Sequence, residues 1–244
     1  NKLKEKITEA VTELYSTVVA NPETNFHFIT GKKAALLAGY PSKTLSNLLP
    51  SALESFAGVG FHFQTSVIKK GDNVLDIGSG SGTDLLIASR LVGSNGQVVG
   101  VDITDAMLKK ARKNAEENDI KNIAVKKGDA ESLPFNNDFF DVVISNGVIN
   151  LTPDKRKSFA EIYRVIKPGG LLSIADIVLR KSVSEESRQD PKLWAECIVG
   201  ALPEDEYLNV IKKSGFANIQ VIDSLDGSAL FQTENSKEVA KNYG

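Results

Sequence analysis

The residues that could do chemistry gather in the stretch VLDIGSGSG, residues 74–82. This stretch holds one acid, Asp76, followed by glycine at three alternate positions. Because glycine has no Cβ, a ligand can approach the main chain of such a loop closely. A second acid, Asp102, ends the next apolar run, at about the 20-residue spacing at which a carboxylate binds ribose hydroxyls. Together these features predict a site for an adenosine-containing cofactor.

Two details distinguish between such cofactors. A dinucleotide needs a small third residue in G-x-G-x-x-G/A, but counting from Gly78 and Gly80 that position is Thr83. The carboxylate of Asp76 would repel a pyrophosphate and attract an ammonium group. S-adenosylmethionine carries adenosine at one end, a free amino acid at the other and a cationic sulfonium between them, so we expect it as the cofactor. A nicotinamide-dependent oxidoreductase stays an alternative, as does a glycine turn with no ligand.

The order of elements predicts an α/β protein. From residue 73 onward, short apolar runs rich in β-branched residues alternate with helical patterns. This alternation favours a doubly wound, mostly parallel seven-stranded sheet in a Rossmann-like fold, covered by helices on both faces. A helix with Thr152 as its N-cap is expected to stop at Pro168-Gly169-Gly170, and a last helix is expected over 204–216. The expected strands are 73–78, 97–103, 123–129, 139–147, 171–178, 218–223 and 228–234.

Two segments lie outside this alternation. Residues 1–65 begin with an amphipathic helix and continue with turn-rich sequence, which predicts a helical cap that contributes to the cofactor and substrate pockets. Residues 180–203 are a charged stretch that leads into LWAECIVGAL, and we expect them to form an insertion beside the substrate pocket.

Composition limits the partners and the setting. The formal net charge of -2 carries no basic surplus for nucleic acid, and no apolar run is long enough to span a membrane. Two histidines and one cysteine make a structural zinc site a poor hypothesis, so no metal is expected. A single cysteine also favours a reducing, cytoplasmic setting. The expected partner is a small-molecule substrate, while the oligomeric state stays open.

Residues 73–178 resemble class I S-adenosylmethionine-dependent methyltransferases. VLDIGSGSG corresponds to the glycine motif of this family, GVDIT to its second-strand acid, KGDAESLPF to its third motif and YRVIKPGGLLSIAD to its passage into the fifth strand. ISNGVINLTPDKR and LWAECIVGAL are similar to two signatures of the arsenite methyltransferases, and the quinone C-methyltransferases are a looser likeness. The resemblance implies a methyltransferase domain over 66–244.

The resemblance also implies a role for individual residues of the cofactor site. Met107 and Tyr15 fit plain core packing as well, and Asp129 fits a turn. The implied contacts are Asp76, Gly78, Ser79 and Gly80 at the methionyl end, Asp102 at the ribose, Ile103, Met107, Asp129 and Ala130 around the adenine, Asn146 beneath the sulfonium and Tyr15 closing over the cofactor.

The pattern departs from the arsenite branch at its metalloid site. That branch holds trivalent arsenic with three thiolates, which are soft ligands for a soft centre. The matching positions here are Val59, Gly147 and Cys197, so one thiol remains. We therefore expect an acceptor other than arsenite, in a pocket that includes Gly147, Trp194 and Cys197. Arsenite methylation with external thiols and a catalytically silent cofactor-binding protein stay alternatives.

The expected chemistry is an in-line displacement in which the acceptor attacks the methyl carbon. Such a step depends on alignment and desolvation, and it needs a base only when the acceptor carries a proton of high pKa. His62 and Asn146 are the candidate catalytic residues, with Glu196 and Asp176 as weaker candidate bases. A histidine between two phenylalanines, as His62 is, also fits plain packing.

Overall fold

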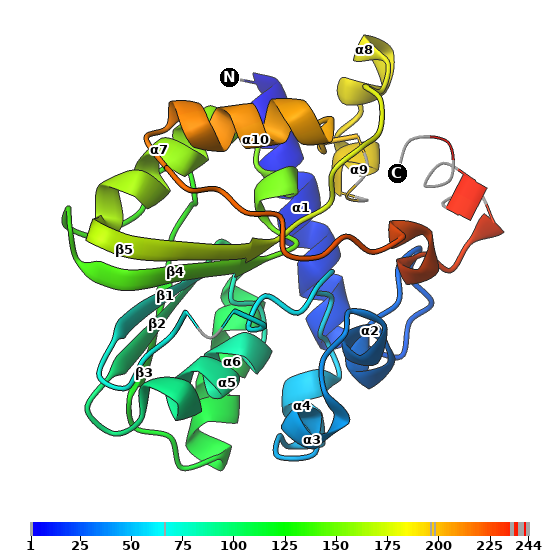
Figure 1. Cartoon of the computed structure of the whole chain (residues 1–244). Helices are drawn as coiled ribbons and strands as arrows, with labels where there is room; N and C mark the ends of the chain where they lie inside the picture. Colours follow the sequence, from blue (N-terminus) through cyan, green and yellow to red (C-terminus); the bar gives the residue numbers. More distant parts are fainter. Residues whose placement is uncertain are drawn as a thin grey trace.

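A parallel five-stranded sheet forms the centre of the molecule (Figure 1). This computed structural model describes residues 2–65, 67–195, 197, 199–234, 237, 238 and 242. Within them the strand order is β3-β2-β1-β4-β5, and all neighbouring pairs are parallel. The strands are β1 (Asn73–Ile77), β2 (Gln97–Asp102), β3 (Ile123–Lys127), β4 (Phe140–Asn146) and β5 (Ile166–Ala175).

Helices cover both faces of the sheet and one of its ends. In Figure 1, α5 and α6 lie on one face, α7 and α10 lie on the other, and α1 runs across the end at which the strands stop. The α-helices are α1 (Lys2–Ala20), α2 (Gly31–Leu37), α3 (Ser42–Leu45), α4 (Pro50–Leu53), α5 (Thr83–Val92), α6 (Asp105–Glu117), α7 (Lys155–Val165), α8 (Glu185–Arg188), α9 (Pro191–Ala195) and α10 (Glu204–Lys213). Two 3-10 turns, Ile149–Leu151 and Gly227–Leu230, complete the elements.

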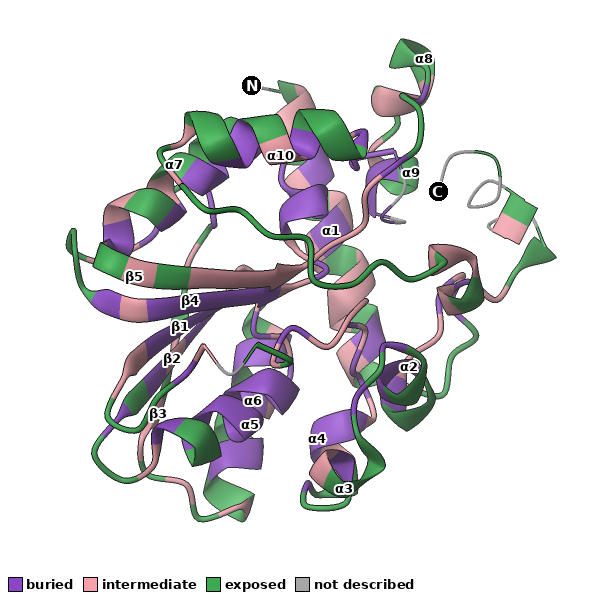
Figure 2. Cartoon of the chain, in the orientation of Figure 1, coloured by how far each residue is buried: buried purple, intermediate pink, exposed green. Residues whose placement is uncertain are grey.

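The central strands are buried on both faces (Figure 2). Successive side chains of a strand point to opposite faces, so β1 contributes to two cores. Leu75 packs in the cluster that contains Phe159 of α7, whereas Val74 packs in the cluster that contains Leu85 of α5. Apolar packing on both faces therefore holds β1, and with it the acid Asp76, in a fixed place.

The strand register brings the ends of β1, β2 and β4 to one edge. Ile77 pairs with Val101 on one side and with Ser145 on the other. The strand order reverses at β1, because β2 and β3 continue to one side of it while β4 and β5 continue to the other. Ligands of open α/β sheets bind at such a reversal, beyond the carboxyl ends of the strands. The fold thus places Asp102 and Asn146 on opposite sides of the glycine loop.

The last two strands expected from the sequence, 218–223 and 228–234, do not form in the described part of the chain. Residues 218–223 form no strand, and Val221 and Ile222 are more than half exposed. In the next segment, the Asp226 side chain accepts a hydrogen bond from Ser228 N and caps a 3-10 turn, so only Phe231 makes an antiparallel bridge, with Phe28. Alternating apolar residues are typical of a strand, but residues 218–223 pair with no strand of the described sheet. The described sheet therefore has five strands, and its doubly wound parallel architecture is confirmed.

Two boundaries also differ from the expected ones. The helix expected from Thr152 begins at Lys155, because the carboxylate of Asp154 accepts the N–H of Lys157 and caps it. Thr152 instead ends the preceding 3-10 turn, with its hydroxyl bonded to Ile149 O. The helix ends at Val165, and β5 follows directly, so the Pro-Gly-Gly stretch lies inside the strand at an irregular register.

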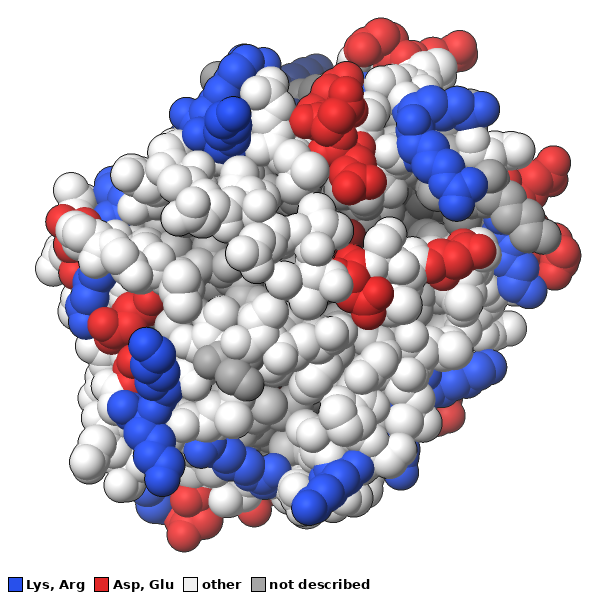
Figure 3. Space-filling view, in the orientation of Figure 1, with Lys and Arg blue, Asp and Glu red and all other residues white. Residues whose placement is uncertain are grey.

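No helix in the described part of the chain is both long and apolar enough to cross a membrane. On the face seen in Figure 3, Lys and Arg lie at separate places around the outline, with Asp and Glu among them.

Candidate functional site

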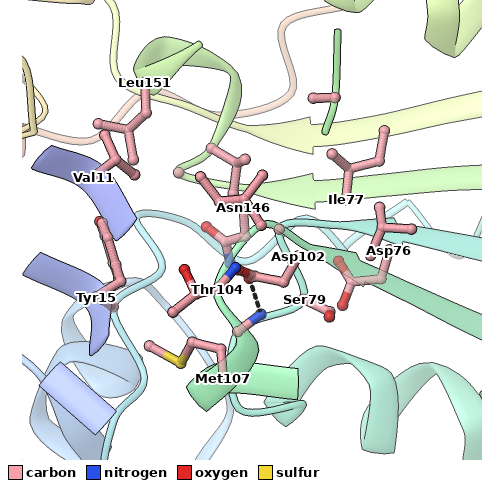
Figure 4. Close-up of a pocket in the computed structure, with 18 of the residues that line it drawn as sticks. Val11, Tyr15, Asp76, Ile77, Ser79, Asp102, Thr104, Met107, Asn146 and Leu151 are labelled. Carbon is pink, nitrogen blue, oxygen red and sulfur yellow. Dashed lines mark hydrogen bonds between the residues drawn. The ribbon is translucent and has the colours of Figure 1, made fainter. Parts of the chain in front are cut away.

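A large cavity lies at the carboxyl edge of the sheet, where the strand order reverses. The space within it, counted together with the open solvent at its mouth, is about 1090 Å³. Its walls come from the glycine loop, the ends of β2 and β4, the loop before α6 and one side of α1. Figure 4 shows Val11 and Tyr15 of α1 on the side opposite Asp76 and Ile77.

The cavity is acidic. Four aspartates line it, and the described lining contains no lysine, arginine or histidine. A phosphate or pyrophosphate would meet repulsion from these groups, while a cation would be attracted. The four are Asp76, Asp84, Asp102 and Asp129.

Asp76 is a buried charged group in the cavity with an oxygen that has no hydrogen-bond partner among the described residues. It is 2% exposed, and among the described residues its Oδ2 has no hydrogen-bond partner. Burial holds the pKa of Asp76 well above the usual range of an aspartate, and the charges of Asp84 and Asp102 raise it further. The buried hydroxyls of Ser55 and Ser79 line the same cavity and also lack partners within the described chain. Since buried polar groups are normally paired, these atoms fit a polar, cationic ligand.

Asp102 is held rigidly at the end of β2. Its Oδ2 accepts the N–H of Gly80 at 2.9 Å, and its Oδ1 accepts the N–H of Thr104 at 2.8 Å. Burial raises the pKa of this carboxyl group, and the two backbone bonds oppose that rise. The carboxylate therefore fixes the glycine loop to the start of α6 and still has lone pairs facing the cavity, where ribose hydroxyls could donate.

The glycine loop needs glycine for steric reasons. Gly78 has a φ of 68°, in the left-handed region, and an added Cβ would overlap the side chain of Val148, whose Cγ1 would lie 2.6 Å away. Gly80 also has a positive φ, but its nearest neighbour would be the sulfur of Met107 at 3.9 Å. Gly78 is thus required by contact with the chain itself, whereas Gly80 borders open space.

The remaining sequence-derived contacts lie together. Ile103, Met107 and Ala130 line the cavity on the β2–β3 side, and Met107 is 2% exposed. Asp129 lines it as well, and its Oδ1 accepts the N–H of Glu131 at 2.8 Å, so it also forms the turn that its sequence suggested. The structure therefore gathers every residue of the expected cofactor site around one cavity, although their roles stay predictions.

Asn146 lines the cavity, but its side-chain amide is already bonded to protein. Its Oδ1 accepts the N–H of Val59 at 2.7 Å, and its Nδ2 donates to Gly60 O at 2.9 Å and to Tyr40 Oη at 2.8 Å. Nδ2 also lies 3.2 Å from Asp84 Oδ2. A direct catalytic role for this amide is therefore poorly supported, because the amide holds the 58–60 loop.

A second, much smaller cavity adjoins the first and has room for little more than one water molecule. Tyr15, Ala57 and Gly58 line both cavities, and Tyr15 Oη lies 3.6 Å from Cys197 Sγ. Burial raises the pKa of Tyr15 well above its ordinary value, and Cys197 adds to that rise. The other lining residues are apolar: Phe28, Ile29, Val59, Ile177, Leu230 and Phe231.

The three positions that correspond to the arsenic-binding cysteines are only partly brought together. Val59 and Cys197 line the second cavity, whereas Gly147 lines the first. A Cβ on Gly147 would lie 3.2 Å from Val59 Cγ1, so a larger side chain there would press on the 57–60 loop. Among the described residues, no cluster of three or more His, Cys, Asp or Glu side chains is placed to hold a metal ion.

The structure places His62 and Trp194 away from both cavities. The His62 side chain is fully buried, its Nε2 lies 3.0 Å from Asp84 Oδ2, and it lines neither cavity, so it is not placed to act as a base. Trp194 also lines neither cavity: it is buried behind Leu151, to whose carbonyl its indole N–H donates at 2.9 Å. Glu196 lies outside the described residues.

Asp84, Ser55 and Gly58 also line the cavity, although the sequence did not predict them there. Asp84 directly follows Thr83, the position that broke the dinucleotide motif, so an acid at the start of the helix could have been noticed. Ser55 and Gly58 lie in turn-rich sequence that gives no local signal of a cavity wall.

Asp176, the weaker candidate base, belongs to a buried cluster at the end of β5. Its Oδ2 accepts from Tyr207 Oη at 2.6 Å and from Asn150 N at 2.8 Å. Burial raises the pKa of Asp176 to about 6, against the opposing effects of Tyr207 and the charge of Lys155. Burial also lowers the pKa of Lys155 to about 8. Asp176 lines neither cavity, so its titration concerns stability.

We expect Asp176 to make the free energy of unfolding pH-dependent. Its folded pKa, about 6, exceeds the ordinary aspartate value of 3.8, so the folded state binds the proton more tightly than the unfolded state does. Stability from this group is full at or below about pH 4 and is lost as the pH rises through 6. Relative to Asp176→Asn, the wild type should lose on the order of 1–3 kcal/mol between pH 4 and pH 7. Urea unfolding at each pH measures this difference, and a difference that is flat or rises with pH contradicts the expectation.

Comparisons with known proteins agree with this geometry. Residues 68–215, more than half of the chain, match the family model described as a methyltransferase domain. An arsenite methyltransferase of Halobacterium salinarum is 34% identical over 183 residues, which cover 75% of this chain and 46% of that protein. A ubiquinone/menaquinone biosynthesis C-methyltransferase, UbiE, of Marinomonas is 45% identical over 113 residues, covering 46% of this chain and 45% of that one.

A solved structure gives the same result for the fold. The arsenic(III) S-adenosylmethionine methyltransferase of Chlamydomonas reinhardtii matches with a TM-score of 0.57 and 33% identity, covering 78% of this chain and 66% of that one. The chain spans about half the length of the curated relatives it matches.

Proposed function

The chain belongs to the class I S-adenosylmethionine-dependent methyltransferases, and on that premise we propose that it transfers a methyl group from S-adenosylmethionine to a small-molecule acceptor. The observation that supports this most is the unpaired, buried carboxylate of Asp76 in a cavity lined by four aspartates and no described cation. These aspartates attract a cationic ligand and repel a ligand that carries phosphate groups.

The residues present fit this cofactor. Asp76 and Ser79 offer unpaired acceptor atoms for the amino-acid end, beside the bare main chain of Gly78 and Gly80. Asp102 offers its carboxylate to the ribose, and Met107 with Ile103 offers an apolar surface to the adenine. Tyr15 of α1 covers the cavity from the far side. When bound, S-adenosylmethionine supplies a methyl group activated by a positively charged sulfur.

The chain's own contribution is alignment and exclusion of water. Residues 1–65 act as a cap, because α1 places Val11 and Tyr15 against the cavity. No buried histidine reaches either cavity, so we assign no general base, and the transfer relies on an acceptor that is nucleophilic without one.

We propose that the acceptor is not arsenite and binds on the side of the cofactor cavity that adjoins the second cavity. The described lining there carries one thiol, Cys197, and otherwise apolar side chains apart from the Tyr15 hydroxyl. One thiolate does not make the three-sulfur cage that trivalent arsenic prefers. An ionised acceptor would lose its hydration against an apolar wall, which favours an uncharged acceptor.

The test is methyl transfer itself. The protein is incubated with methyl-labelled S-adenosylmethionine and a small-molecule cell extract, and the products are resolved by mass spectrometry. The proposal predicts label in an uncharged small molecule and none in nucleic acid. Label on added arsenite with glutathione would instead support arsenite methylation with external thiols. Tight cofactor binding with no transfer to any acceptor would support a silent binding protein.

A further inference from the structure

A buried polar network reaches the cofactor cavity through Asp84 and Asn146. The carboxylate of Asp84, in the first turn of α5, accepts a hydrogen bond from Tyr40 Oη at 2.6 Å and another from His62 Nε2 at 3.0 Å. Its Oδ2 is also 3.2 Å from Asn146 Nδ2. Tyr40, His62 and Asp84 are all at most 6% exposed. These four residues come from four segments of the chain that are far apart in sequence.

The network is hydrogen-bonded to a short segment of the cavity wall, the 58–60 loop. Asn146 binds the 58–60 loop with both ends of its amide, because Oδ1 accepts from Val59 N and Gly60 N while Nδ2 donates to Gly60 O. A Cβ on Gly58 would lie 2.5 Å from Asn146 Nδ2, so the loop lies flat against this side chain. Gly58 lines both cavities and therefore forms part of the partition between them.

The network lies at one end of the cavity only. Asn146 ends β4, on the side of β1 away from β2, and Asp84 lies in the first turn of α5, which directly follows the glycine loop. Asp102 and Asp129 lie on the other side of β1, at the ends of β2 and β3. A disturbance of the network therefore reaches the Asp76 side of the cavity before the Asp102 side.

We infer that Tyr40 and His62 are positioning residues that act through Asp84 and Asn146 to hold the partition at the amino-acid end of the cofactor cavity. Neither side chain touches either cavity, so any effect on the ligand passes through their bonds to Asp84 and Asn146. This inference rests on the proposed function, because it assumes that the amino-acid end of the cofactor lies beside Asp76.

The test compares two probes that differ at that end. Calorimetry measures the Kd of S-adenosylhomocysteine, which has the amino-acid end, and of adenosine, which lacks it. Tyr40→Phe removes the hydroxyl and keeps the ring, which packs on Phe56 and Phe61. We expect about tenfold weaker binding of S-adenosylhomocysteine and less than about twofold change for adenosine.

Two further variants separate positioning from loss of stability. Ser89→Ala removes a buried hydroxyl of the same helix, bonded to Asn122 Oδ1 at 2.6 Å away from both cavities, and should leave the ratio of the two Kd values unchanged. Adding Tyr40→Phe to Asn146→Ala should weaken S-adenosylhomocysteine binding no further than Asn146→Ala alone, because Tyr40 acts through that amide. His62→Gln serves as a second variant should Tyr40→Phe fail to fold.

The outcomes are distinguishable. A wild-type chain that binds neither probe overturns the proposed function and this inference with it. A wild-type chain that binds both, with Tyr40→Phe weakening the two probes equally or neither, overturns the inference alone. A selective loss at the amino-acid end that is absent in Ser89→Ala supports it.

Discussion

Replacing Asp76 with asparagine is expected to weaken S-adenosylmethionine binding by about a hundredfold or more while making the protein more stable. The affinity falls because the carboxylate offers the one buried charge without a partner in the described site. The free energy of unfolding should rise by on the order of 1 kcal/mol, since burial and two neighbouring aspartates disfavour the ionised group. Calorimetry measures the first effect and urea unfolding the second.

Asp141→Asn is the matched control. The Asp141 carboxylate pairs with Lys167 at 2.7 Å and accepts Asn73 N at 2.9 Å, outside both cavities. The same substitution there should lower stability and leave cofactor affinity unchanged. If Asp76→Asn also lowers stability and binds as well as the wild type, Asp76 is a structural acid and the electrostatic account of the site is wrong.

The raised pKa of Asp76 also predicts a proton linkage. A cationic ligand binds the ionised carboxylate, so binding lowers the pKa of Asp76. Below the raised pKa of the free protein, binding should therefore release a proton, and affinity should increase as the pH rises towards that pKa. Titrations in two buffers of different ionisation enthalpy measure the proton release, which Asp76→Asn should abolish.

Gly78→Ala is expected to abolish cofactor binding and to cost about 3 kcal/mol of stability. At the φ of 68° an alanine is strained, and its Cβ would overlap the side chain of Val148, which itself lines the cavity. The loop must shift or Val148 must move into the cavity. Thermal unfolding and calorimetry with S-adenosylmethionine measure the two losses.

Two variants test the steric origin of this effect. Gly71→Ala has the same kind of backbone, with a φ of 90°, but nothing within 4 Å of the added Cβ. It should cost only about 1 kcal/mol of backbone strain and leave binding intact. Adding Val148→Ala to Gly78→Ala should recover part of the lost stability. Equal losses in the two single glycine variants, with no recovery in the double variant, would contradict the contact with Val148.

The parts of the fold that could be predicted are those with a local pattern. Apolar runs rich in β-branched residues gave β1 to β4 to within a few residues. The central strands β1 and β4 are mostly apolar because both their faces are covered, whereas the edge strand β3 is only partly buried and ends in two lysines. Asp76, Asp102 and the glycines stand at the ends of these runs, so the positions of the cofactor-site residues followed from the strand order. The alternating apolar residues of 218–223 were misleading, since alternation does not supply a hydrogen-bonded neighbour.

The parts that could not be predicted depend on contacts between distant segments. His62 was a reasonable candidate base from its residue type alone, but its bond to Asp84 and its full burial arise only when residues 62 and 84 meet. Asn146 was expected beneath the sulfonium and lines the cavity, yet its bonds to the 58–60 loop have no signature in the sequence near residue 146. These parts of the cavity wall could therefore not be predicted from the sequence.

We propose that an acidic cavity with an unpaired Asp76 Oδ2 selects a cationic sulfur nucleoside over a phosphate-bearing cofactor. Parallel calorimetric titrations of the wild-type chain with S-adenosylmethionine and with NAD test this most directly. We expect saturable binding of S-adenosylmethionine that Asp76→Asn weakens, and no measurable binding of NAD. Binding of NAD without binding of S-adenosylmethionine would contradict it.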